Sequence, residues 1–112
     1  MHMIEAVIKP TALDAVIAKL AELEILGVTA IEVKGFGKQK GHTERYRGGR
    51  MDVGFVPKIL LKIAVKSEDL DRAIEGVTGA ARTGQVGDGK LFVYQLDKVV
   101  RIRTGETDND AL

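Results

Sequence analysis

Two hydrophobic periods alternate along the chain. Apolar side chains alternate, or run almost without interruption, in four segments, which predicts four β-strands over residues 3–9, 28–36, 57–65 and 90–96. Between these segments the apolar positions recur every three or four residues, which predicts one helix within residues 9–27 and another over 67–82.

The expected ends of these helices come from single residues. Thr11 and Ser67 are suited to cap the two helix starts, and Gly27 is suited to end the first helix. Residues 99–103 are expected to extend the last strand or to add to the edge of the sheet. The polar tail that follows is expected to be mobile.

The order of the predicted elements is strand, helix, strand, a long loop, strand, helix, strand. Two such split units in residues 1–112 predict one domain of the α+β class, a ferredoxin-like βαββαβ sandwich with both helices on one face of the sheet. The strands at 57–65 and 90–96 are apolar on both faces, and two helices cannot cover both. A homo-oligomer that buries the open face explains this better than a partly exposed sheet.

Composition removes several classes of function. The 112 residues carry a net charge of +1, so any basic function must be local. The chain has no cysteine, which excludes a disulfide scaffold, a thiolate zinc site and a cysteine nucleophile. No apolar run reaches the roughly 18 residues of a membrane span. The cytoplasm is therefore the expected compartment, with no direct insertion into a membrane.

The sharpest local signal is "TGQVGDGK" at 83–90. Gly84, Gly87 and Gly89 allow successive amide groups to point inward and bind an anion, and Lys90 adds a positive charge. Leu91 stands where a P-loop needs serine or threonine, so this is not a Walker motif. A plain glycine-rich turn remains the alternative.

Two arginines near the end of the chain favour phosphate binding. Arg101 and Arg103 are two positions apart, so in an extended chain they would project to the same side. Their guanidinium groups match phosphate oxygens. Together with the glycine loop they indicate a polyphosphate ligand, with ordinary surface charge as the alternative.

Other patterns are weaker. "KGFG" at 34–37 imitates the start of an RNA-recognition motif, but no aromatic platform follows it, so nucleic acid is not an expected partner. His42 and Glu44 lie in the long loop, without the fixed surroundings that a general base needs. A binding protein therefore fits better than an enzyme.

Several of these motifs occur together in one known family. "EVKGFGKQKGHTERYRG" (32–48), "FVPK" (55–58), "TGQVGDGK" (83–90) and "VRIRTGE" (100–106) resemble the PII signal-transduction proteins over essentially the whole chain. The resemblance implies a homotrimer with nucleotide sites in the clefts between subunits. It also implies a target-binding T-loop at about 37–55, a phosphate-binding B-loop at about 82–90 and a C-terminal segment at about 98–112.

The resemblance assigns ligands to particular residues. It implies that ATP or ADP is bound by ten residues: Gly35, Gly37, Lys38, Gln39, Gly87, Asp88, Gly89, Lys90, Arg101 and Arg103. It further implies that the neighbouring subunit supplies the two arginines. It implies that 2-oxoglutarate is bound beside ATP-bound Mg²⁺ by Gln39, Lys40, Gly41 and Lys58, with Gln39 also ligating the metal. Lys38 stands where the family usually has arginine, which keeps the charge but loses the bidentate fork.

The resemblance also implies a target. The expected target is a membrane transporter, most simply an ammonium transporter, which would recruit the protein from the cytoplasm to the membrane. The residues expected to contact it are Arg45, Tyr46, Arg47, Gly48, Arg50 and Met51. Met51 and Gly49 replace the tyrosine and serine that some members have modified, so neither covalent switch is expected. Lys62 replaces a glutamate near the nucleoside. The alternatives are a weak ATPase and a regulator of another transporter that does not sense 2-oxoglutarate.

Overall fold

Four antiparallel strands form the sheet of this chain. The structure, a computed structural model, describes residues 1–36, 44–46, 49–51 and 54–112. The strands are β1 (His2–Ile8), β2 (Val28–Phe36), β5 (Phe55–Val65) and β6 (Lys90–Gln95), in the order β2-β5-β1-β6. This is the ferredoxin-like α+β arrangement that the order of the hydrophobic periods predicts, and that prediction is confirmed.

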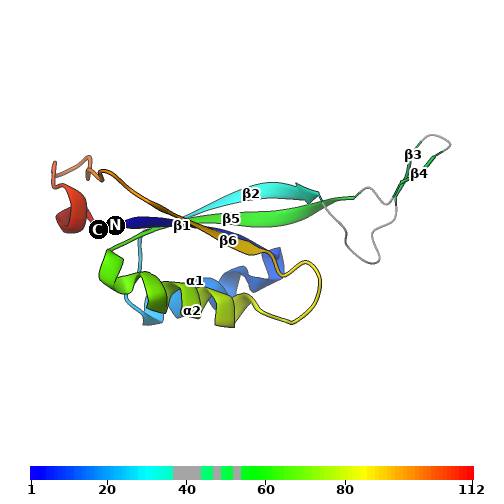
Figure 1. The fold of residues 1–112 in the computed structure, drawn as a ribbon, viewed down its shortest axis with the longest axis horizontal. Coiled ribbons are helices and arrows are strands. Elements are labelled where there is room, and N and C mark those ends of the chain that lie inside the picture. The colour runs from blue at the N-terminus through cyan, green and yellow to red at the C-terminus, as the bar shows by residue number, and fades with distance from the viewer. Residues whose placement is uncertain (37–43, 47–48, 52–53) are drawn as a thin grey trace.

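The helices α1 (Leu13–Glu22) and α2 (Leu70–Ala81) cover one face of this sheet (Figure 1). The register places Ile4 opposite Ile63 and Ala6 opposite Leu61, and all four side chains are buried. Because successive residues of a strand point to opposite faces, the alternate apolar positions of β1 and β5 all reach the helices. The helices complete the core with Val16, Leu20, Ala73 and Val77.

The predicted helix ends are wrong in three places. Thr11 lies inside a short 3₁₀ turn, η1 (Pro10–Ala12), because Pro10 already fixes the first turn. Ser67 likewise lies in η2 (Ser67–Asp69), and its hydroxyl accepts a hydrogen bond from the Met1 amino group at 2.8 Å. α1 ends at Glu22, and the left-handed residue is Glu24 (φ 62°), not Gly27.

In the described part of the chain, no helix lies over the opposite face of the sheet (Figure 1). Ile31 of β2 and Phe92 and Tyr94 of β6 point to this face and are 41%, 52% and 43% exposed. β6 is an edge strand, so in the single chain it is not buried on both faces as its apolar run predicts.

The long loop contains a short hairpin. β3 (Glu44–Tyr46) pairs with β4 (Gly49–Met51), with Arg45 opposite Arg50. The segment expected as a long loop at about 37–55 therefore contains two short strands. β5 also begins two residues earlier than predicted, at Phe55, whose ring lies 5.4 Å from that of Phe36 between centroids.

The C-terminal segment differs most from its prediction. Residues 99–103 do not form a strand: Val100 makes one isolated bridge to Thr107, and residues 102–104 form a turn. The amide of Gly105 donates to the carbonyl oxygen of Arg101 at 2.8 Å, which closes that turn. The tail then forms the 3₁₀ helix η3 (Asp108–Ala111). Local hydrogen bonds thus replace the predicted strand, and the tail contains a short helix that the sequence did not predict.

Candidate functional site

The loop at 83–90 joins α2 to β6 and takes a shape that only glycine allows. Gly84, Gly87 and Gly89 have φ angles of 85°, 101° and 99°, in the left-handed region. A Cβ atom on Gly89 would lie 1.7 Å from the carbonyl oxygen of Val7. The loop is therefore pressed directly against the end of β1, at a position where no other residue fits.

Asp88 holds this loop from the inside. Its carboxylate accepts the amide of Thr83 at 2.7 Å, the amide of Gly84 at 2.9 Å and the hydroxyl of Thr83. The hydroxyl and amide of Thr83, together with the Gly84 amide, hold the pKa of Asp88 far below its ordinary value. The carboxylate is thus ionised at neutral pH and faces the loop's own donors.

Lys9 pairs with this carboxylate. Its Nζ atom lies 3.2 Å from Oδ1 of Asp88, and it donates to the hydroxyl oxygen of Thr83 at 3.4 Å. The sequence prediction did not include Lys9 or Thr83. Thr83 opens the glycine motif and so gave a local signal, whereas Lys9 reaches the loop only because β1 and β6 are neighbours in the sheet.

Lys58 is the buried charge of the site. It is 8% exposed, and among the described residues no other charged side chain is buried. Its Nζ atom donates to the carbonyl oxygen of Gly87 at 2.5 Å. Gly35 makes room for its stem, since a Cβ atom there would lie 3.1 Å from Cγ of Lys58. Burial lowers the pKa of Lys58 and the charge of Lys9 lowers it further, while Asp88 opposes both.

A cavity of about 500 Å³ opens beside Lys58. It lies between η1, β2 and β5, and its lining consists of Pro10, Glu32, Val33, Lys34, Pro57, Lys58 and Ile59. A small anion in it would lie beside the Lys58 side chain, whose ammonium group has two donors besides the one that Gly87 accepts. The cavity and the glycine loop therefore share Lys58.

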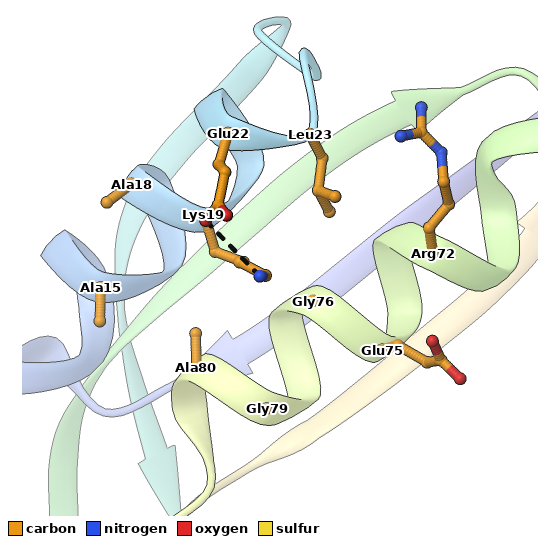
Figure 2. Close-up of a pocket in the computed structure, with 10 residues that line it drawn as sticks. All are labelled: Ala15, Ala18, Lys19, Glu22, Leu23, Arg72, Glu75, Gly76, Gly79 and Ala80. Atoms are coloured by element: carbon orange, nitrogen blue, oxygen red, sulfur yellow. Dashed lines mark ion pairs between the residues drawn. The ribbon is translucent and has the colours of Figure 1, made fainter.

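A larger hollow lies on the helical layer, away from this chemistry. Figure 2 shows its walls on α1 and α2, where small residues such as Ala15, Ala18 and Gly79 form much of the lining. Three of its charged side chains form ion pairs within their own helical segment: Lys19 pairs with Glu22 at 3.5 Å and Arg72 with Asp69 at 2.7 Å. It is a seam between packed helices, and the candidate site is the one at Lys58.

Arg101 and Arg103 are not brought to the glycine loop within one chain. The C-terminal segment lies at the end of the sheet opposite to the 83–90 loop (Figure 1). Arg101 instead forms an ion pair with Glu106 at 2.9 Å and lines a separate cavity of about 530 Å³ together with Leu112. Because residues 102–104 form a turn, the extended geometry behind the same-side prediction is wrong.

Other predicted site residues lie outside the described part of the chain: Gly37, Lys38, Gln39, Lys40, Gly41, Arg47 and Gly48. Arg45, Tyr46, Arg50 and Met51 belong to the β3–β4 hairpin, of which the structure describes the backbone pairing. Lys62 lies on the open face of the sheet, where its Nζ atom is 3.8 Å from Glu5, which also accepts the hydroxyl of Tyr94 at 2.9 Å.

Within residues 1–36, 44–46, 49–51 and 54–112, neither a metal-binding cluster nor a membrane-spanning helix is present. No group of three or more histidine, aspartate or glutamate side chains there could hold a metal ion. No helix in the same ranges is long and apolar enough to cross a membrane.

The fold and the site define a ferredoxin-like protein with a rigid glycine loop and a buried lysine at one end of its sheet. The chain belongs to the nitrogen regulatory protein P-II family, whose model matches residues 1–106. It is 55% identical to a nitrogen regulatory protein P-II of Rhizobium etli and 51% identical to one of Pasteurella multocida. It is 49% identical to nitrogen regulatory protein P-II 1 of Escherichia coli, and all three matches span the full length of both chains. The protein is a signal-transduction regulator of the P-II type.

Proposed function

We propose that this regulator senses ATP or ADP together with 2-oxoglutarate, and that it does so by binding and not by catalysis. The observation that carries the proposal is the contact between the buried Lys58 ammonium and the carbonyl oxygen of Gly87 at 2.5 Å. It places a single desolvated cation between the glycine loop and a cavity of about 500 Å³. An anion in the cavity would then pair with Lys58 directly beside the loop that holds the nucleotide.

The phosphates of the nucleotide are assigned to the later part of the loop. The amides of Thr83 and Gly84 donate to Asp88, and the amide of Gln85 donates to the hydroxyl oxygen of Thr83. We therefore assign the amides of residues 86–89 to the phosphates, with Lys90 adding charge at the start of β6. The side chain of Asp88 then shapes the loop and does not itself contact phosphate.

The cavity beside Lys58 is assigned to 2-oxoglutarate. A dicarboxylate next to a triphosphate needs a cation between them, because like charges at short range repel. Mg²⁺ prefers oxygen ligands and is commonly held through substrate phosphates. Gln39 would add one amide oxygen to that set, and Lys58 would receive the distal carboxylate. Lys40 and Gly41 would complete the pocket.

The subunit arrangement is proposed as a homotrimer. Exposed apolar side chains, including Phe92 and Ile31, give the open sheet face a reason to pack against copies of the chain. Arg101 and Arg103 lie at the far end of the sheet from the loop (Figure 1), so they reach a nucleotide only if a neighbouring subunit supplies them. A cleft between subunits satisfies both conditions.

The output is assigned to the segment at 37–55. It holds Arg45, Arg47 and Arg50, and the backbone pairing of the β3–β4 hairpin places two of them opposite each other. We propose that this basic arm contacts a membrane transporter, an ammonium transporter in the simplest case, and draws the protein from the cytoplasm to the membrane. Arginine-rich arms suit carboxylates and carbonyl groups at such a surface.

Titration calorimetry tests this function. We expect 2-oxoglutarate to bind in the presence of Mg-ATP, and to bind poorly alone or with ADP, because the metal bridge is then incomplete. Lys90→Ala should weaken ATP binding first. Hydrolysis of ATP should not exceed the spontaneous rate. Strong 2-oxoglutarate binding without nucleotide, or turnover that Lys90→Ala abolishes, would contradict the proposal.

A further inference from the structure

Lys9 occupies a position that the assignment of ligands leaves unexplained. It follows β1 directly, and its Nζ atom lies 3.2 Å from Oδ1 of Asp88 and 3.4 Å from the hydroxyl oxygen of Thr83. The Lys9 and Asp88 side chains are only 24% and 22% exposed. This is therefore a partly desolvated pair, in which a charge matters more than it does at an open surface.

The pair connects two elements that are far apart in sequence. Lys9 is fixed to the sheet through β1, and Asp88 collects the amides of Thr83 and Gly84 from the other end of the glycine loop. Gly89 packs against the carbonyl oxygen of Val7 beside them. The loop is thus attached to the end of β1 by the close approach of Gly89 to Val7, and to Lys9 by an ion pair and a hydrogen bond.

Lys9 offsets the negative charge that Asp88 places in the loop. Asp88 places a negative charge within a loop that is proposed to receive phosphate, and two anions at close range repel. The ammonium group of Lys9 lies against Oδ1 of Asp88 and offsets that charge. The other oxygen, Oδ2, still accepts the amides of Thr83 and Gly84. Neither task requires the ammonium group to touch a ligand.

We propose that Lys9 is a positioning residue for nucleotide binding, acting through Asp88 to keep the 83–90 loop in its anion-binding shape. The inference rests on the proposed nucleotide site. Lys9 holds Asp88, and Asp88 holds the amides of Thr83 and Gly84, which leaves the amides of residues 86–89 for the ligand. Removing the charge loosens the loop and leaves the negative charge of Asp88 without its counterion.

A double-mutant cycle distinguishes positioning from direct phosphate contact. Binding of ATP and of ADP is measured by calorimetry without 2-oxoglutarate, so that Lys58 is not tested at the same time. We expect Lys9→Met to weaken both nucleotides about tenfold, the size seen when a residue that orients ligand-binding groups is lost. In an Asp88→Asn background the same change should have little effect, because Lys9 then has no carboxylate through which to act.

Two further variants complete the design. Lys9→Arg keeps the charge beside Asp88 and should restore most of the affinity. Lys19→Met makes the same chemical change in the surface pair with Glu22 on α1, and should leave binding unchanged. Hydrogen exchange at the amides of Thr83 and Gly84 should be faster in Lys9→Met and normal in Lys9→Arg, with or without nucleotide.

The outcomes separate the two proposals. Wild-type protein that binds neither nucleotide overturns the proposed function, while the exchange rates still decide whether Lys9 holds the loop. Wild-type binding with unchanged affinity in Lys9→Met overturns the positioning role. A tenfold loss that persists in the Asp88→Asn background also overturns it, because Lys9 would then be contacting the ligand.

Discussion

The ammonium group of Lys58 and the carbonyl oxygen of Gly87 are joined by a hydrogen bond of 2.5 Å. Lys58 belongs to β5, a strand paired on both sides, whereas Gly87 belongs to a loop at the end of the sheet. This hydrogen bond therefore connects the strand that carries the cation to the glycine loop.

Replacing Lys58 by alanine should separate the two ligands. We expect 2-oxoglutarate binding in the presence of Mg-ATP to weaken by about 1.5–3 kcal/mol, typical for the loss of a charge-assisted hydrogen bond. ATP binding should remain mostly intact, because the loop keeps Asp88 as its internal support. Calorimetry on both ligands is the measurement, with Lys19→Ala as the surface control. Equal losses for both ligands would contradict the assignment.

Two glycines of α2 should respond oppositely to alanine. At Gly79 a Cβ atom meets nothing within 4 Å, so Gly79→Ala should stabilise the fold by about 0.5–1 kcal/mol through helix propensity. At Gly76 it would lie 2.8 Å from Cδ1 of Leu23 and 3.3 Å from Cγ of Lys19, so both side chains must shift and Gly76→Ala should destabilise by about 1 kcal/mol (Figure 2). Denaturant unfolding measures both. A stabilising Gly76→Ala would show that α1 and α2 pack less closely here.

A charge on the open face of the sheet should break the assembly. Phe92 is 52% exposed on that face, and Phe92→Glu would place a carboxylate where subunits are proposed to meet. We expect sedimentation equilibrium to give a trimer for the wild type and smaller species for this variant. Ile17→Glu is the matched control, since Ile17 is 39% exposed on the helical layer. Wild-type monomers at micromolar concentration would contradict the proposal.

The stability of the chain should depend on Asp88 in acid. Because the pKa of Asp88 is lowered in the folded state, its ionised form stabilises the fold above its unfolded pKa of about 3.9. That contribution is lost as the pH falls through the folded-state value. The difference in unfolding free energy between wild type and Asp88→Asn should be constant above about pH 5 and should shrink in stronger acid. A difference that grows on acidification would reverse the assignment.

The hydrophobic periods predicted the strands and helices because burial dominates their formation. Ile4, Ala6 and Ile8 are buried at every second position, because only one face of this strand packs against the helices. The helix ends were missed because competing local contacts decide them. Pro10 starts a 3₁₀ turn before Thr11 can cap, and the Met1 amino group takes the hydroxyl of Ser67.

The site was predictable where its chemistry is local in sequence. The three glycines of the 83–90 loop predict a tightly turning backbone, and in the structure all three have positive φ angles. Lys9 could not be found in this way, because only the pairing of β1 with β6 brings it to Asp88. The geometry of Arg101 was missed because hydrogen bonds to Glu106 and Gly105 favour a turn over an extended strand.

The internal carboxylate of the glycine loop has a consequence for the entropy of binding. Fixing the backbone of a residue costs about 1–2 kcal/mol in conformational entropy. Because Thr83 and Gly84 are already hydrogen-bonded to Asp88 in the folded protein, a ligand does not have to order them. A nucleotide meeting such a loop loses little of its binding free energy to ordering the protein. In the proposed nucleotide site, discrimination between ATP and ADP would then depend on what the third phosphate contacts, because Thr83 and Gly84 are already fixed.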